Sequence, residues 1–230
     1  MSDLSKLEDR LGLKFNNQDL LLQALTHRSY INENPGFRLG HNERLEFLGD
    51  AVLELATTEY LYNNFPEMPE GEMTSLRAAL VNSIMTGFVA GRLHLNGFLL
   101  LSRGEAKDIG RGRQYILANA LEAVIGAIYL DAGYEAARDF IAREIIPELP
   151  RIRETRLYRD PKSRFQEEAQ DKVGITPTYE VSREWGPDHD KHFVVGVFLE
   201  KEPVAEGEGK SKQEAQQKAA EEGLKVKGWE

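Results

Sequence analysis

The amino-acid sequence predicts an α+β protein of two domains, in which an all-helical part precedes a small α-β-β-β-α unit. From Leu4 to about Leu149, apolar residues recur at helical spacing and do not alternate with period two. Residues 150–161 are charged and bracketed by prolines, and the hydrophobic period changes after them. We therefore place one domain at residues 1–150, a linker at 151–159 and a second domain at 160–229.

Turn signals interrupt the helical periodicity of the first domain, among them the Asn-Pro-Gly sequence at 34–36 and Gly133. The stretches between such signals are long enough to form helices. We expect helices over residues 2–11, 17–26, 42–64, 70–95, 114–131 and 134–148.

The second domain opens with the dipeptide Asp-Pro at 160–161, which favours the start of a helix over residues 162–172. Ser211 and Glu214 have the spacing of a capping box, in which each side chain binds the other residue's backbone N–H. A closing helix is therefore expected over residues 211–225. Between the two helices, strands are expected over residues 178–184, 192–199 and 203–206.

The chain of 230 residues carries 29 Lys and Arg against 38 Asp and Glu, a formal net charge of −9. This negative field disfavours polyanions, so nucleic acid would have to bind at local basic clusters or through metal ions. Without Cys, any metal must be held by oxygen or imidazole ligands. No apolar stretch approaches the length of a membrane span and residues 1–30 carry no secretion signal, so we expect a cytoplasmic protein without membrane contact.

A narrow acidic stripe runs along the helix expected over residues 42–64. Glu46, Asp50 and Glu54 lie one turn apart on this stripe, and apolar side chains cover most of the remaining circumference. The stripe is either the solvated face of an amphipathic helix or one side of a functional site. This helix alone does not decide between the two.

The helix expected over residues 114–131 is apolar in almost every direction, so it should be buried on nearly all sides. Asn119 and Glu122 interrupt it and share one face. A buried carboxylate without a partner is costly or takes up a proton, so Glu122 needs a partner. A metal cation is one candidate, and an arginine such as Arg44 or Arg77 is the other.

If the two helices cross with these faces together, Glu46, Asp50, Asn119 and Glu122 form an all-oxygen cluster, and Gly126 leaves space beside it. Hard oxygen ligands select Mg²⁺ or Mn²⁺, and Mg²⁺ in proteins commonly works on phosphates. The chemistry that this cluster indicates is metal-assisted hydrolysis of a phosphodiester.

Residues 42–53, NERLEFLGDAVL, closely resemble the signature of the bacterial ribonuclease III family. Supporting matches are LTHRSY at 25–30, PEGEMTSLRAALVN at 69–82 and ILANALEAVIGAIYLDAGY at 116–134. The C-terminal part resembles this family's double-stranded-RNA-binding domain in PKSRFQE at 161–167, GPDHDKHF at 186–193 and GEGKSKQEAQQKAA at 207–220. The resemblance spans nearly the whole chain.

This resemblance implies a helical endonuclease domain that forms a homodimer, followed by a double-stranded-RNA-binding domain. It implies Mg²⁺-dependent cleavage of double-stranded RNA, with Mn²⁺ as a substitute and without a small-molecule cofactor. The implied products carry 5′-phosphate and 3′-hydroxyl ends with short 3′ overhangs. The implied substrates are precursors of ribosomal RNA and other structured RNAs, including messenger and transfer RNAs.

The resemblance also assigns roles to the acidic cluster. Glu46, Asn119 and Glu122 correspond to the family's metal ligands, and Asp50 and Glu122 correspond to its catalytic acids. Asn119 departs from the family pattern, which has Asp at this position. Because an amide oxygen is neutral, it binds a divalent cation more weakly than a carboxylate does. We expect a working enzyme with looser metal binding, and the alternative is a double-stranded-RNA-binding regulator that has lost cleavage.

Glu43 and Glu70 match acidic positions that the family places near the cleavage valley. Glu43 is also favoured by the helix dipole, because it lies in the first turn of an expected helix. A metal-dependent phosphohydrolase for small substrates is a further alternative function, but it leaves the C-terminal unit without a role.

Duplex RNA is read through its shape, its phosphates and its 2′-hydroxyls, because the major groove hides the base edges. Lys210, Ser211 and Lys212 begin the closing helix, and a helix N-terminus favours a phosphate. Gln216 lies one turn beyond Lys212 on the same face and can add a polar contact.

By resemblance, Gln166 and His189 correspond to the family's contacts in the minor groove of RNA. Arg111 and Arg113 belong to a basic, glycine-interrupted segment that is expected to be a loop before the buried helix. That segment is either a solvated charged loop or, by resemblance, a clamp on the RNA backbone.

Overall fold

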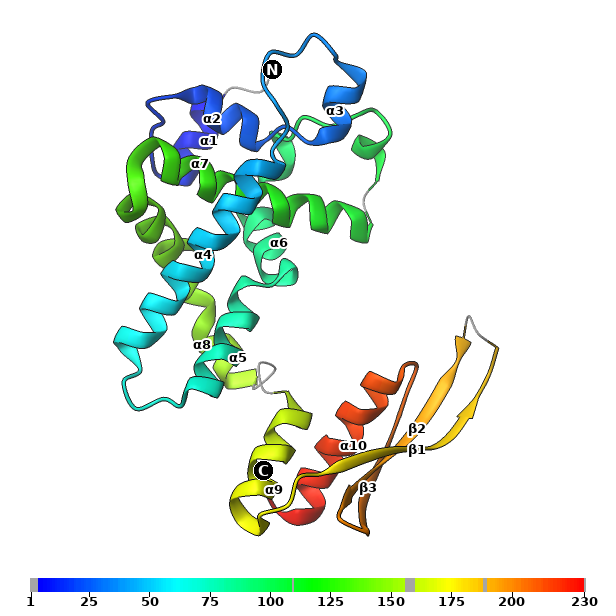
Figure 1. Cartoon of the computed structure of the whole chain (residues 1–230). Helices are drawn as coiled ribbons and strands as arrows, with labels where there is room; N and C mark the ends of the chain where they lie inside the picture. The colour runs from blue at the N-terminus through cyan, green and yellow to red at the C-terminus, as the bar shows by residue number, and fades with distance from the viewer. Residues whose placement is uncertain (1–3, 109, 156–159, 188–189, 230) are drawn as a thin grey trace. The chain divides into compact units, whose positions relative to one another are not determined.

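The computed structural model describes residues 4–108, 110–155, 160–187 and 190–229 (Figure 1). Its internal contacts divide the chain into two units, Met1–Tyr158 and Arg159–Glu230. The described part of the first unit contains helices and no strand of a sheet, whereas the second combines two helices with a three-stranded sheet. The fold class expected from the hydrophobic periodicity is therefore confirmed.

The first unit is built from α-helices joined by short 3₁₀ turns. The helices are α1 (Leu4–Leu11), α2 (Gln18–Ala24), α3 (Arg28–Glu33), α4 (Glu43–Asn64), α5 (Glu70–Val81), α6 (Ser83–Arg92), α7 (Arg111–Glu144) and α8 (Leu149–Thr155). The 3₁₀ turns are η1 (Leu95–Gly97), η2 (Glu105–Lys107) and η3 (Ile146–Glu148). Gly133, with φ of 84° and ψ of −179°, breaks the helical backbone inside α7, which confirms the expected interruption between two helical segments.

The single helix expected over residues 70–95 is wrong, because the chain breaks into α5 and α6 at Asn82. The Asn82 side-chain oxygen accepts hydrogen bonds from the backbone N–H groups of Ile84 and Met85, at 3.1 and 3.0 Å. These bonds cap the start of α6, and a cap of this kind competes with continuation of the preceding helix. Helical spacing continues across the break, so periodicity alone did not reveal it.

The segment expected to be a linker from residue 151 begins as helix instead, because α8 runs through Thr155. Leu149 and Ile152 of this helix are buried in the core of the first unit. Their spacing of three residues supplies one apolar face, which the surrounding prolines and charges conceal in the sequence. Residues 156–159 of the expected linker lie outside the described residues.

The second unit has the expected α-β-β-β-α order, with α10 packed against β2 and β3 and α9 packed against α10 (Figure 1). Its elements are α9 (Pro161–Val173), β1 (Thr178–Trp185), β2 (His192–Leu199), β3 (Glu202–Gly209) and α10 (Lys212–Lys227). The strands are antiparallel in the order β1-β2-β3.

Strand β3 is longer than the expected 203–206, because pairing with β2 continues through Gly207 and Gly209. Glycine is normally unfavourable inside a strand, but here it lets α10 approach. A Cβ atom at Gly207 would lie 2.2 Å from the backbone nitrogen of Ala219. The extra strand length therefore depends on a tertiary contact.

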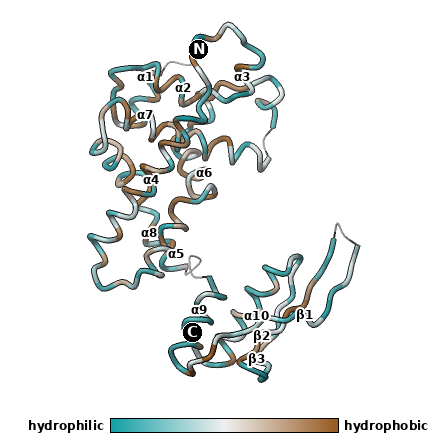
Figure 2. Tube along the Cα trace, viewed as in Figure 1, coloured by the Kyte–Doolittle hydropathy of each residue, from teal (hydrophilic) through white to brown (hydrophobic). Residues whose placement is uncertain are grey.

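Each unit has its own apolar core. In the first, buried side chains of α4, α6 and α7 pack together, and hydrophobic segments recur along these helices (Figure 2). In the second, Phe165 of α9 and Leu224 of α10 pack against Val197 of β2. Trp229 closes this core, with its ring centroid 5.4 Å from that of Phe165.

A stretch of the described chain within Gly112–Glu154 is apolar and long enough, by length and composition, to cross a membrane. This corrects the expectation that no such stretch exists. Its residues Leu121, Val124 and Ile125 are fully buried in the core of the first unit. Burial in the core accounts for the hydropathy of this helix, because core helices pass the same compositional test.

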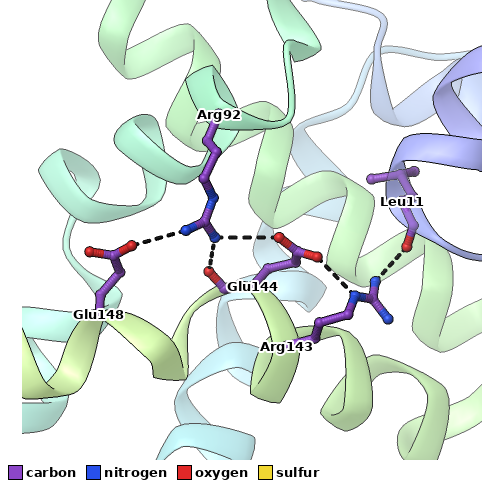
Figure 3. A network of polar contacts seen from close by, with 5 residues as sticks. All are labelled: Leu11, Arg92, Arg143, Glu144 and Glu148. Atoms are coloured by element: carbon purple, nitrogen blue, oxygen red, sulfur yellow. Dashed lines mark hydrogen bonds and ion pairs between the residues drawn. The ribbon is translucent and has the colours of Figure 1, made fainter.

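An arginine network joins α6 to the C-terminal end of α7 (Figure 3). The Arg92 guanidinium donates to Glu148 Oε1 at 3.0 Å and to Glu144 Oε2 at 3.3 Å, and it also donates to the Glu144 carbonyl oxygen. Arg143 donates from Nε to Glu144 Oε1 at 2.8 Å, and from Nη2 to the carbonyl oxygen of Leu11. The network thus links three helices that are distant in sequence.

Helices α4 and α7 cross so closely that backbone touches backbone. A Cβ atom at Gly49 would lie 1.7 Å from the carbonyl oxygen of Glu122, and one at Gly126 would lie 2.2 Å from the carbonyl oxygen of Leu45. Only glycine fits at either position, since no side-chain rotamer relieves a collision between Cβ and backbone. The crossing point therefore fixes which residues of the two helices become neighbours.

We expect Gly49→Ala and Gly126→Ala to destabilise the first unit, because each added methyl group overlaps a backbone atom of the other helix. Overpacking of this kind costs about 2 kcal/mol or more, which corresponds to a fall of roughly 5 °C in the Tm of a domain of this size. The measurement is thermal unfolding followed by far-UV circular dichroism.

Gly91→Ala in α6 is the matched control, because a Cβ atom at Gly91 meets nothing within 4 Å. This variant should keep or raise the Tm, since alanine is the better helix former. Equal effects of Gly49→Ala and Gly91→Ala would contradict the close crossing.

Candidate active site

The crossing of α4 and α7 brings the predicted acidic cluster together. Glu46 and Asp50 flank Gly49 on α4, and Asn119 and Glu122 lie on the facing turn of α7. The backbone of Glu122 is itself the contact surface for Gly49. The residues that interrupt the apolar pattern of each helix therefore meet at one place.

Glu122 shows the strongest electrostatic consequence of this placement. Burial raises its pKa, and repulsion from the Asp50 and Glu46 carboxylates raises it further, to about 7. Both causes act in the same direction, because each disfavours the charged form of the carboxyl group. Glu122 can therefore exchange a proton near neutral pH.

The pKa of Glu46 is also raised, by burial first, then by the charges of Glu43 and Asp50. The Asn119 side chain opposes this shift, because its amide group favours the charged form of the Glu46 carboxyl. Asn119 therefore acts on the cluster by stabilising the charged form of a neighbouring acid.

No arginine or lysine of the described chain forms an ion pair with Glu46, Asp50 or Glu122. The arginine alternative for Glu122 is therefore not supported, and the Arg77 guanidinium instead donates to the Thr58 hydroxyl at 3.1 Å. The donors are carboxylate and amide oxygens, which fit a hard divalent cation. As these side chains lie, no three Asp, Glu or His residues of the described chain converge on one metal position.

The two accessory acids lie in different surroundings. Glu43 is 3.4 Å from Arg28 Nη1 and 3.8 Å from His41 Nδ1, and its charge contributes to the raised pKa of Glu46. Glu70 begins α5, accepts a hydrogen bond from Thr74 at 3.0 Å, and is not among the charges that shift the pKa of Glu46 or Glu122.

Sequence reasoning did not single out Arg28 and His41, although both contact Glu43. A signal was available for His41, which stands next to the acidic helix in sequence. None was available for Arg28, because it lies on α3, a helix that the sequence analysis did not predict.

Glu54, the third member of the sequence stripe, is exposed and has no part in the pKa shifts of the cluster. The solvated-face interpretation therefore describes Glu54, whereas the site interpretation describes Glu46 and Asp50. One stripe contains both kinds of residue.

At the start of α10, the Ser211 hydroxyl accepts from the Glu214 N–H at 3.1 Å, and the Glu214 carboxylate accepts from the Lys210 N–H at 2.9 Å. This variant of the capping box confirms the predicted start of the closing helix, with Lys210 rather than Ser211 as the second donor. Lys212 is exposed, and its Nζ lies 5.7 Å from the centroid of the Phe193 ring.

Gln216 is engaged within the second unit, because its side-chain oxygen accepts a hydrogen bond from Lys162 Nζ at 2.8 Å. Lys162 also lies 5.0 Å from the centroid of the Tyr179 ring. Sequence analysis did not select Lys162, since nothing in its spacing connects α9 with α10. Gln166 is exposed on α9, and His189 lies outside the described residues.

The basic segment before the buried helix is shorter than expected, because α7 begins at Arg111 instead of residue 114. Arg113 is half-buried in the first turn of α7, and its guanidinium donates to the carbonyl oxygen of Ala106 at 3.3 Å. The side chain of Arg111 lies outside the described part of the chain.

Comparisons with known proteins agree with this architecture. Residues 17–149 match the family described as Ribonuclease-III-like, and residues 161–227 match the double-stranded RNA binding motif. The chain is 46% identical to ribonuclease 3 of Desulforamulus reducens over 216 residues, which cover 94% of this chain and 88% of that protein. It is also 46% identical to ribonuclease 3 of Natranaerobius thermophilus over 218 residues, 95% of this chain and 94% of that protein.

A solved structure, the nuclease domain of ribonuclease III from Campylobacter jejuni, is 43% identical with a TM-score of 0.58. The match covers 64% of this chain and 99% of that domain. Structural flexibility in a region involved in dimer formation is described for that domain.

With a chelator present, we expect Glu122→Gln to stabilise the chain at pH 8 and to have little effect at pH 5. The pKa of Glu122 rises from 4.5 to about 7 on folding, so the folded chain binds more protons than the unfolded chain between these values. The free energy of unfolding therefore falls as pH rises through this window, and the loss is complete above it. After allowance for solvent screening, the variant should gain about 1 to 2 kcal/mol at pH 8, as measured by urea unfolding.

Glu54→Gln is the control, because Glu54 is an exposed acid of the same helix. It should leave the pH dependence of stability as it is in the parent chain. A gain for Glu122→Gln that is the same at pH 5 and pH 8 would contradict the electrostatic origin.

Proposed function

Because the chain belongs to the ribonuclease III family, we propose that it is an endonuclease that hydrolyses phosphodiester bonds of double-stranded RNA with the help of a divalent cation. The observation that carries the proposal is the partly buried acidic cluster at the crossing of α4 and α7, in a chain that also has a double-stranded RNA binding motif. The proposed products carry 5′-phosphate and 3′-hydroxyl ends with short 3′ overhangs.

We propose Mg²⁺ as the cofactor, with Mn²⁺ as a substitute, held through side-chain oxygens of Glu46, Asn119 and Glu122. When bound, such a cation supplies positive charge that neutralises the phosphate and makes water more acidic. Positive charge in this cluster also offsets the repulsion that raises the pKa of Glu122.

Asp50 and Glu122 are the proposed catalytic acids. Asp50 is exposed at the rim of the cluster, where its carboxylate can accept a proton from the attacking water. Glu122 has a pKa of about 7 in the chain by itself, so its carboxyl group can hold or release a proton at physiological pH. Glu43 and Glu70 are proposed as accessory acids of the cleavage valley.

A homodimer is the proposed working form. Helix α4 exposes Phe47, Leu55 and Tyr62, with 81%, 56% and 71% of their surface accessible in the single chain. Large apolar side chains gathered on one helix commonly mark an interface. Two copies related by a two-fold axis would supply two acidic clusters, one for each strand of a duplex.

The proposed RNA contacts of the second unit are Gln166, His189, Lys210, Ser211, Lys212 and Gln216. In the first unit, Arg111 and Arg113 are proposed to hold the RNA backbone. We propose a cytoplasmic location and, as substrates, precursors of ribosomal RNA together with other structured RNAs.

Asn119 favours a second candidate function, that of a double-stranded-RNA-binding regulator without cleavage. A neutral amide stands among the carboxylates and lowers the pKa of one of them, Glu46. The cluster therefore attracts a cation less strongly than four carboxylates would.

One assay separates the two functions: the purified chain is incubated with an end-labelled, fully paired RNA duplex in Mg²⁺, in Mn²⁺ and in chelator. We expect metal-dependent cuts that are offset between the two strands. A gel shift without cuts in any metal would select the regulator. In a parallel incubation with mononucleotides in place of the duplex, turnover would select a phosphohydrolase for small substrates.

In the same assay, Glu122→Gln should reduce cleavage by orders of magnitude and leave duplex binding within about twofold. The variant loses a carboxylate of the cluster, whereas the double-stranded RNA binding motif lies in the other unit. Glu54→Gln is again the control and should cleave as the parent does. Retained turnover by Glu122→Gln would remove Glu122 from the catalytic acids.

Asn119→Asp should lower the Mg²⁺ concentration needed for half-maximal cleavage, because a carboxylate binds the cation more strongly than an amide does. In chelator the same variant should be less stable than the parent, since it replaces an amide that favours the charged form of Glu46 with a further negative charge. A metal titration and a thermal unfolding curve measure the two effects. An unchanged Mg²⁺ requirement would contradict the idea that Asn119 weakens metal binding.

A further inference from the structure

An aspartate lies directly beside one of the proposed RNA-binding lysines. The Asp190 carboxylate, which precedes β2, has Oδ1 3.3 Å from Lys210 Nζ, at the start of α10. The same oxygen is 3.8 Å from His192 Nε2. The ammonium group that is proposed to bind an RNA phosphate therefore already lies beside a carboxylate.

The position of Asp190 is fixed by the backbone around it. Gly186 has φ of +92°, and a Cβ atom there would lie 2.3 Å from the carbonyl oxygen of Asp190. The Asp190 N–H donates to the carbonyl oxygen of Pro187 at 2.9 Å. Two residues after Asp190, the His192 ring stacks on the Trp185 ring with an interplanar angle of 16°. The short Asp190 side chain thus presents its charge at a defined place.

Lys210 and Lys212 differ in this respect. Lys212 lies over the Phe193 ring, and no carboxylate of the described residues forms an ion pair with it. Its ammonium group can meet a phosphate without first leaving a partner. Lys210, by contrast, already has the Asp190 carboxylate within ion-pair distance, so a phosphate competes with it for the ammonium group.

We propose that Asp190 lowers the affinity for duplex RNA by competing with phosphate for Lys210. The inference rests on the proposed function, in which Lys210 contacts RNA. In the bound state the displaced carboxylate remains within the Debye length of the phosphate, about 8 Å at physiological salt, and repels it. The competition acts on the Lys210 contact and leaves the Lys212 contact intact.

The test compares full-length variants that bind a labelled RNA duplex in chelator, so that no cleavage occurs, with fluorescence anisotropy as the readout. Asp190→Asn keeps the size of the side chain and removes its charge. It should tighten binding about two- to fivefold, the range for loss of an exposed ion-pair competitor. It should also make the association constant more sensitive to salt. The slope of its logarithm against the logarithm of salt concentration should steepen by up to about one unit if Lys210 then neutralises one more phosphate.

Three further variants make the result specific. Asp190→Glu retains the charge and should bind as weakly as the parent. Glu206→Gln removes an equal charge from an exposed position of β3 and should change affinity less than Asp190→Asn does. Lys210→Ala should cost more affinity in the Asp190→Asn background than in the parent, because Lys210 is then fully available.

Unchanged or weaker binding by Asp190→Asn would overturn the proposal, and so would an equal loss from Lys210→Ala in both backgrounds. Failure of the parent chain to bind any RNA duplex is a different outcome. It would overturn the proposed function of the second unit and the role of Asp190 with it.

Discussion

The geometry of the acidic cluster depends on one contact, the approach of two helix backbones at Gly49 and Gly126. At this point α4 and α7 have no side chains between them, so the residues on either side of the contact are drawn together. Glu46, Asp50 and Glu122 then lie close enough to repel one another, and the pKa of Glu122 shows the result. The two glycines at the crossing therefore determine how close the surrounding acidic residues lie to one another.

The acidic cluster of the first unit and the lysines of the second unit differ in how their charges are paired. The first concentrates negative charge around Glu122 without any ion pair from the described residues, and this leaves the cluster ready for a cation. In the second unit, Lys210 is paired with Asp190, Lys191 with Glu184 and Lys218 with Glu214. These pairs let a chain with a net charge of −9 keep a lysine-rich surface and limit its attraction for polyanions.

Periodicity and residue chemistry predicted the two-unit fold, the start of α10 and the residues of the acidic cluster. They did so because Glu122 interrupts a helix that is otherwise apolar, a conflict that is visible in the sequence itself. The break at Asn82, the helix α8 and the full length of β3 were not predictable in this way, because caps and close packing against other elements determine them. The contacts of Glu43 with Arg28 and of Gln216 with Lys162 depend on tertiary structure as well. The roles of the acidic and RNA-contacting residues in catalysis and binding stay predictions.

The distribution of tryptophan has a spectroscopic consequence. The chain has two tryptophans, and both belong to the second unit, where Trp229 is buried beside Phe165 and Trp185 is half exposed over His192. Intrinsic tryptophan emission therefore reports on the second unit alone, with one fluorophore in its core and one at the end of β1. The first unit contains tyrosine but no tryptophan, so it does not contribute tryptophan emission. Unfolding of the second unit can therefore be followed separately in an unlabelled sample of the whole chain.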